Sequence, residues 1–323
     1  MAVIASLVTV AVTSSPASAG PPPVMTGYVP LPVDAMVGGM QGVTASAGST
    51  IDFTVGITNA AGGAIMYYDQ WEDGYEGDIA NPVQSTTLVF GDGNTANGNA
   101  ATHCAACSGD LLPQGAPLIM RNNVSSPRGT SPVLFDGGDK VASTRGFAIT
   151  AGGFPTNLGS LIAGVVASYD TSKYSTAYTV PVGQDTPVPS GTSDAFAYTG
   201  LVVQAAEDGT FVEVDRDVDG ITDVSGTINE GKTLFVDGSV NEGATVRASK
   251  PVQVQLVTGD TTATYESRWY TIFPDSVLSN DYMSMAGASN GDFRTVNYLY
   301  NPSDSDITVT PTCASCSGSF TVP

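Results

Sequence analysis

Short segments of the chain alternate apolar with polar side chains. The alternation is clearest over residues 51–57 and 251–258, and it recurs more briefly over residues 211–214. A period of two places one face of a segment on a core and the other in water, as in antiparallel sheets. Valine, threonine, tyrosine and phenylalanine fill these segments, and such side chains suit a pleated surface. We therefore predict β-strands at these positions.

Turn signals separate the predicted strands. Asp-Gly, Asn-Gly and Gly-Gly pairs recur between them, and such pairs mark tight turns. After the N-terminal segment, no stretch of helical length has its apolar residues at a helical period. Many short strands divided in this way are typical of sandwiches and barrels, so we predict an all-β fold.

A weak internal repeat links the two halves of the chain. Residues 65–74 and 211–220 are both an extended apolar run that enters an acidic turn and ends in Asp-Gly. Residues 170–185 resemble residues 260–275 when one gap is allowed. Repeated sequence indicates repeated architecture. We expect tandem, related antiparallel units, each a β-sandwich or a barrel-like sheet.

The repeat also suggests how the chain is divided. One turn-rich stretch has no counterpart of matching length in the second copy, so we interpret it as a long loop insertion in the first unit. A segment rich in proline, serine and threonine precedes the second copy and is the best candidate for a linker. We expect a signal peptide at 1–19, a first unit at 20–190 with its insertion at about 81–120, a second unit at 191–290, and the start of a third, truncated unit of a longer array at 291–323.

Composition favours a location outside the cell. Residues 1–19 combine an apolar run with a closing Ala-Ser-Ala, the pattern of a secretory signal. The net charge is −20, from 31 acidic and 11 basic residues, which disfavours nucleic acid as a partner. No later segment is apolar enough to predict a transmembrane span. We expect a secreted or cell-surface protein whose partner is an extracellular protein or a glycan, or other copies in an array.

One acidic turn has the order of a short calcium loop. Asp215, Asp217 and Asp219 alternate along the chain and are followed by Ile221 and Asp223. Alternate carboxylates converge on one cation in such loops, and a backbone carbonyl such as that of Ile221 completes the ligand set. The twelfth position holds glycine rather than the glutamate of an EF-hand. The sequence predicts a strand-borne Ca²⁺ site, and the alternative is a solvated hairpin turn.

The first copy of this turn has a different chemistry. Asp69 and Asp73 correspond to the outer acids, but Trp71 replaces the central one, so calcium is a weaker prediction there. Trp71 and Tyr75, beside Asp73 and Glu76, are also consistent with a sugar-binding platform or a pair of carboxylates that hydrolyses glycosides. The remaining interpretation is a cluster of core aromatic side chains next to an acidic turn.

The four cysteines form two Cys-x-x-Cys pairs. In a secreted chain such pairs usually form disulfides, so local Cys104–Cys107 and Cys313–Cys316 bridges are the simplest prediction. A single zinc site with four thiolate ligands is the alternative. His103 is the only histidine, and one histidine without a nucleophile motif is poor evidence for a hydrolase.

The second unit resembles the IgGFc-binding protein N-terminal domain family. The resemblance rests on residues 200–214, with their Asp-Gly-Thr turn, and on residues 243–254, which read Gly-x-x-Val-x-Ala-x-x-Pro-Val and a strand. Residues 67–78 are similar to strings in large secreted bacterial surface proteins. Both resemblances imply a β-rich extracellular module of adhesive or structural type. We therefore expect a non-catalytic, adhesin-like surface module, with a carbohydrate-binding or glycoside-hydrolysing module as the alternative.

Overall fold

The all-β prediction is confirmed by the computed structural model. Its strands form one seven-stranded, two four-stranded and one two-stranded sheet, all antiparallel. The expected signal peptide, residues 1–19, lies outside the described residues. The structure describes residues 23–43, 50–156, 164–189, 193–262, 267–283, 296–303, 305–312 and 318–323.

The first unit is a sandwich of two four-stranded sheets, with strand orders β1-β6-β3-β4 and β5-β2-β7-β8. Tyr68 and Phe90 of one sheet and Phe53 and Ile57 of the other belong to one buried core. In β2 every second side chain is buried, as the alternation predicts. The strands are β1 (Met25–Tyr28), β2 (Thr50–Asn59), β3 (Met66–Asp69), β4 (Thr87–Phe90), β5 (Pro117–Ser125), β6 (Lys140–Ser143), β7 (Phe147–Pro155) and β8 (Gly164–Ser168).

The second unit is a seven-stranded sheet that curls into a barrel-like shape around β14. The first part of β14 pairs with β11 and β9, and its later part pairs with β10 and β15. The register shifts between Arg247 and Val252, and a long strand that bends in this way can connect two sheet faces. The strands are β9 (Ser175–Thr179), β10 (Tyr198–Ala205), β11 (Thr210–Asp215), β12 (Val224–Ile228), β13 (Thr233–Val236), β14 (Thr245–Gly259) and β15 (Ser267–Ile272).

The seven-stranded sheet begins earlier in the chain than the sequence suggests. β9 ends at Thr179, before residue 191, at which we expected the second unit to start. Its partner in the sheet is β14, where Tyr178 lies opposite Val246. The difference arises because strand pairing is a contact between distant segments, and a five-residue strand next to a proline-rich segment gives no sign of its partner.

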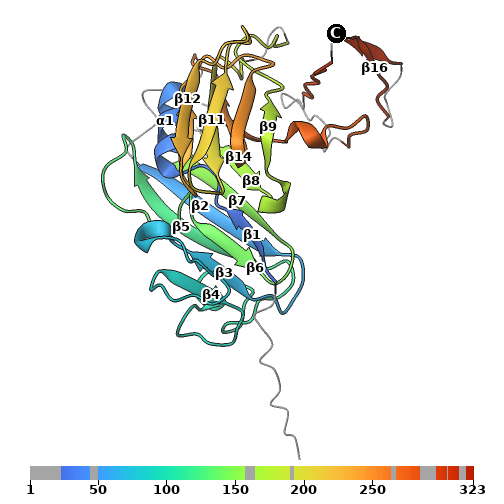
Figure 1. Ribbon diagram of the computed structural model, residues 1–323. Helices are drawn as coiled ribbons and strands as arrows, with labels where there is room; N and C mark the ends of the chain where they lie inside the picture. Colours follow the sequence, from blue (N-terminus) through green and yellow to red (C-terminus); the bar gives the residue numbers. More distant parts are fainter. Residues whose placement is uncertain are drawn as a thin grey trace, which may run out of the picture.

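The expectation that the chain has no helix is wrong, because residues Val33–Val43 form an α-helix, α1. Seven of its eleven residues are buried, so the helix lacks the broad polar face that produces a helical period in the sequence. Its glycines allow close packing against the second unit. A Cβ atom at Gly42 would lie 2.1 Å from the ring of Tyr198, and one at Gly39 would lie 2.8 Å from Val257. Figure 1 shows α1 beside the strands of the upper unit.

The two units share one apolar core along their seam. Val202, Val257 and Trp269 of the second unit pack with the buried side chains of the first. The edge of β8 lies against β15, where the hydroxyl of Thr271 donates a hydrogen bond to the carbonyl oxygen of Ala167. The units therefore meet through packed side chains rather than through a loose linker.

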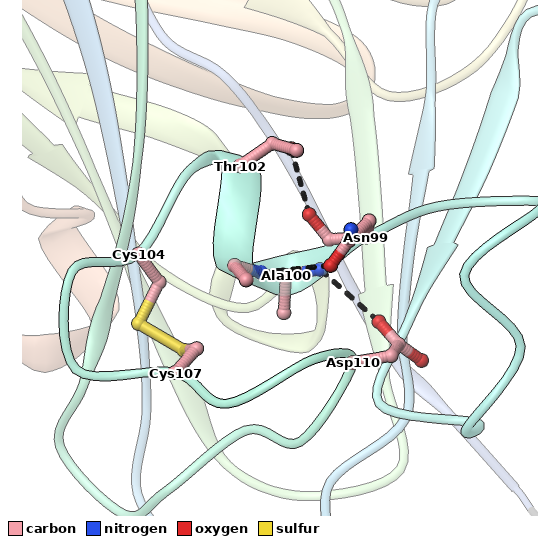
Figure 2. The surroundings of a disulfide bond; sticks show 7 residues. Asn99, Ala100, Thr102, Cys104, Cys107 and Asp110 are labelled. Carbon is pink, nitrogen blue, oxygen red and sulfur yellow. Dashed lines mark hydrogen bonds between the residues drawn. A yellow bond between two sulfur atoms is a disulfide. The ribbon is translucent and has the colours of Figure 1, made fainter.

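The expected insertion at about 81–120 is only partly an insertion, because β4 and the start of β5 lie within it and belong to the two sheets of the sandwich. The segment between these strands is a loop held by one buried carboxylate and one disulfide (Figure 2). Asp110 accepts hydrogen bonds from the backbone N–H groups of Gly91, Gly93 and Ala100, at 2.8, 2.9 and 3.2 Å. The Cys104–Cys107 disulfide is confirmed. A bridged pair offers no thiolates, so the four-thiolate zinc site is excluded. Cys313 and Cys316 lie outside the described residues.

The remaining elements are short. Residues 291–323, the expected start of a third unit, contain a hairpin whose side chains are mostly exposed. Among the helices that the structure describes, none has both the length and the apolar character needed to span a membrane. These elements are the strands β16 (Ile307–Val309) and β17 (Phe320–Val322) and the 3₁₀ turns η1 (Trp71–Asp73), η2 (Ala100–Thr102), η3 (Thr171–Lys173) and η4 (Asp275–Val277).

Candidate functional site

The hairpin between β11 and β12 brings together three of the predicted calcium ligands. β11 and β12 pair up to Val214 and Val224, so Asp215 and Asp223 stand at the base of the loop that joins them. Asp215, Asp217 and Asp223 each place a carboxylate oxygen within 4.8 Å of the other two. Among the described residues this is the one group of three or more acidic, histidine or cysteine side chains close enough to share an ion.

Backbone N–H groups hold these carboxylates in place. The two oxygens of Asp215 accept hydrogen bonds from Val218 at 2.9 Å and from Gly220 at 3.0 Å. Asp223 accepts one from the N–H of Arg216 at 2.8 Å. Val218 has a φ of 66° and Gly220 has one of 86°, and a valine rarely adopts such a backbone. The loop therefore has a defined conformation that turns its acids toward one another.

The other two predicted ligands lie outside the three-carboxylate group. The side chain of Asp219 accepts a hydrogen bond from the N–H of Ile221 at 2.8 Å, and the side chain of Ile221 is 68% exposed. Whether the carbonyl of Ile221 serves as a ligand stays a prediction.

The charge of the cluster is only partly balanced. The guanidinium of Arg216 lies with its Nε 3.9 Å from Asp223, and exposed pairs at such a separation contribute little. Three carboxylates within a few ångströms repel one another unless a cation lies between them. The geometry can therefore bind a hard cation through oxygen atoms, with water completing the coordination sphere.

Asp69 and Glu76 of the first acidic turn are structural acceptors. Asp69 is buried and accepts a hydrogen bond from the N–H of Glu76 at 2.7 Å. Glu76 accepts from the N–H groups of Val83 and Gln84, at 2.7 and 2.6 Å. Burial raises the pKa of Asp69 to about 6. These carboxylates accept hydrogen bonds from backbone N–H groups and so order the loop between β3 and β4.

Asp73 is separate from this pair. It accepts hydrogen bonds from the hydroxyls of Thr86 and Ser85, and the bond from Thr86 lowers the pKa of Asp73. In the part of the chain that the structure describes, Asp69 and Asp73 join no group of three acidic side chains close enough to share an ion. The weaker calcium prediction at this turn gains no support.

Trp71 and Tyr75 do not form an open platform. The ammonium of Lys232, from the second unit, lies 3.1 Å from the centroid of the Trp71 ring. The indole Nε1–H of Trp71 donates to Asp136 at 3.3 Å. The hydroxyl of Tyr75 donates to the carbonyl oxygen of Gly138 at 2.7 Å. These contacts occupy the face of the Trp71 ring and the polar atoms of both side chains, which a sugar would need. Trp71 and Tyr75 therefore contribute to the contact between the two units.

A pair of buried acids lies behind Trp71, and the sequence analysis missed it. The carboxylate of Asp139 accepts hydrogen bonds from the hydroxyl of Tyr68 at 2.5 Å and from the N–H of Asp136 at 3.0 Å. Burial raises the pKa of Asp136 to about 7 and raises the pKa of Asp139 well above its usual range. The only sequence signal was an Asp-Gly-Gly-Asp turn, which resembles any hairpin loop.

His103 packs against aromatic rings. Its ring centroid lies 5.8 Å from that of Phe90 and 5.5 Å from that of Phe135, edge to face in both cases. Partial burial lowers the pKa of the imidazole. The backbone carbonyl of His103 also accepts a hydrogen bond from Ile119 of β5 at 2.7 Å. The residue therefore anchors the insertion to the sandwich.

Comparison of the chain with protein-family models, curated proteins and solved structures finds no match. The resemblance of residues 200–214 and 243–254 to a family of extracellular modules stays a prediction.

Proposed function

We propose that this chain is a non-catalytic, adhesin-like extracellular module whose β11–β12 hairpin is stabilised by Ca²⁺. The observation that carries the proposal is the approach of Asp215, Asp217 and Asp223 to within 4.8 Å of one another in an exposed turn. The acidic net charge and the N-terminal signal pattern are consistent with a protein that works outside the cell.

The ligand set favours calcium over other cations. Carboxylates, carbonyls and water are hard ligands that suit Ca²⁺, whereas zinc and copper prefer sites with imidazole or thiolate. Ca²⁺ also accepts irregular coordination by six to eight oxygens, whereas Mg²⁺ demands a near-ideal octahedron. An exposed loop with three carboxylates and access to water meets the first requirement better than the second.

Calcium would act on this module by raising the free energy of unfolding. A cation between the three carboxylates offsets their repulsion only in the folded hairpin, so it binds the folded state preferentially. At 100 times its dissociation constant such a ligand stabilises the folded state by about 2.7 kcal/mol. A rigid hairpin at an exposed end of the second unit would suit an adhesive surface or contacts between copies in an array.

A thermal melt of residues 20–323 in Ca²⁺ and in EDTA tests the proposal. We expect EDTA to lower the melting temperature by roughly 5–10 °C, because a change of 1 kcal/mol shifts the midpoint of a chain of this size by about 2–4 °C. Asp217→Ala should abolish the dependence on Ca²⁺. Asp219→Ala is the matched control. It removes the same charge from a residue that is two positions along the chain and lies outside the three-carboxylate cluster.

The calcium proposal fails if wild type melts at the same temperature in both buffers. It also fails if Asp219→Ala removes the response as fully as Asp217→Ala does, since the effect would then reflect total charge rather than the three-carboxylate geometry. In either case the hairpin would be an ordinary solvated turn, and the sheet would depend on its core alone.

A further inference from the structure

A groove of about 650 Å³ opens along the seam between the two units. We call it the seam groove. Its lining includes Thr26 and Lys140 of the first unit and Glu207, Glu230 and Lys250 of the second unit. Ser172, in the connection between β8 and β9, also lines it. Its volume falls within the range of about 300–1,000 Å³ that is usual for small-molecule sites.

The groove holds a hydrogen-bond donor and an acceptor side by side. Oε1 of Glu230 accepts a hydrogen bond from the hydroxyl of Tyr28 at 2.5 Å and from the ammonium of Lys140 at 2.8 Å. The side chain of Lys140 is 17% exposed and that of Glu230 is 23% exposed, so both are fixed yet reachable. An ammonium has three donors. Lys140 and Oε2 of Glu230 therefore keep capacity for a ligand.

The exposed edge of the groove, at Lys250 and Glu207, also places an ammonium donor beside a carboxylate acceptor. The ammonium of Lys250 donates to the carbonyl oxygen of Asp208 at 2.6 Å and lies 3.9 Å from the carboxylate of Glu207. Lys250 and Glu207 are both well exposed. The hydroxyls of Thr26 and Thr171 are hydrogen-bonded to each other at 2.7 Å, which joins the first unit to the β8–β9 connection.

The mixed charges limit the class of ligand. An anion in the groove would face Glu207, Asp208 and Glu230, and a cation would face Lys140 and Lys250. A sugar hydroxyl, in contrast, donates one hydrogen bond and accepts two, and so matches neighbouring carboxylates and ammonium groups at once. We propose that the seam groove binds a short segment of a neutral glycan.

Recognition in the groove would rely on hydrogen bonds. Tyr28, the aromatic residue of the lining, is only 2% exposed, so its ring face is not a stacking platform. A glycan here would touch both units and would stabilise their contact, since a ligand favours the state that binds it. The inference is independent of the calcium hairpin, whose residues are not among those that line the groove.

Isothermal titration of residues 20–323 with cellotetraose, maltotetraose and chitotetraose tests the inference. We expect saturable binding of at least one of these probes, weakened at least tenfold by Glu230→Gln and by Lys250→Ala. Lys250 lies at the exposed rim, so its variant should retain the wild-type melting temperature and separate a lost contact from unfolding. EDTA and Asp217→Ala should leave the affinity unchanged.

Four results would overturn the inference. One is the absence of binding by all three probes at millimolar concentration. Another is binding that both groove variants leave intact. The third is tighter binding of poly-glutamate or poly-lysine than of any neutral probe, which would make the groove a site for a charged polypeptide. The fourth is glycan binding that EDTA abolishes. That result would place the glycan site at the calcium hairpin rather than in the groove, and it would support the calcium proposal.

Discussion

At the scale of single residues, the same side-chain type has different roles in the two acidic turns. Asp215 and Asp217 are at least partly exposed and face one another, whereas Asp69 is buried and binds the backbone of the next loop. The two turns have similar sequences, so the alternating acids alone do not distinguish them. Burial decides the outcome, because a buried carboxylate must satisfy its hydrogen bonds within the protein.

The effect of burial on Asp136 can be tested through the pH dependence of the unfolding free energy. Its folded-state pKa of about 7 lies above the value of about 3.9 in an unfolded chain. The folded protein then binds more protons, so this residue makes stability fall as pH rises from about 4 to about 7. Asp136→Asn, which can still accept a hydrogen bond from Trp71, should reduce the loss of unfolding free energy between pH 5 and pH 8 by about 2–3 kcal/mol.

Urea denaturation at the two pH values measures this effect. Asp219→Asn is the control, because it removes the same charge from an exposed loop and should leave the pH dependence close to that of wild type. A pH dependence in Asp136→Asn that equals that of wild type would contradict the assignment of a proton to Asp136 at mildly acid pH.

At the scale of elements, the strands follow the sequence closely and the helix does not. Residues 51–57, which alternate, lie within β2 with every second side chain buried. Helix α1 has seven buried residues of eleven and contains Gly38, Gly39 and Gly42, and glycine is a poor helix former. Such a helix forms because tertiary packing compensates for its weak propensity. Its glycines bring the backbone close to β10 and β14, as the contacts of Gly42 and Gly39 demonstrate.

Gly42→Ala tests this packing. In an exposed helix the change would stabilise by about 1 kcal/mol, but here the new methyl group would overlap the ring of Tyr198. We expect a net loss of about 1–3 kcal/mol in unfolding free energy, measured by chemical denaturation. Gln41→Ala, at an exposed neighbouring position, should change stability by less than about 0.5 kcal/mol. Stabilisation by Gly42→Ala would mean that the helix has room to move.

At the scale of the whole molecule, the two units are joined by a core that neither could complete alone. Trp269 is 5% exposed and packs with the first unit, and a Cβ atom at Gly164 would lie 2.1 Å from its indole ring. Buried polar side chains, among them Gln204 and Gln253, continue the seam; their amide groups bind the carbonyl oxygens of Val29 and Tyr28. Such an interface resembles a domain interior more than a flexible joint.

Trp269→Ala should therefore destabilise the whole chain. We expect a loss of about 3–5 kcal/mol, the usual cost of deleting a large buried aromatic side chain. Calorimetry should show one cooperative transition for wild type and a lower or divided transition for the variant. Val165→Ala, in which an exposed β8 side chain is shortened, should have little effect. Two separate transitions in wild type would contradict the shared core.

The strand-rich fold, the Cys104–Cys107 bridge and the acidic hairpin could be predicted from the sequence, because each depends on residues close together in the chain. Period-two alternation, a Cys-x-x-Cys spacing and alternate aspartates all act over a few residues. The burial of particular acids, the helical conformation of α1 and the contact of Lys232 with Trp71 could not be predicted in this way. These features arise from contacts between segments far apart in the chain, where burial and packing override local preference.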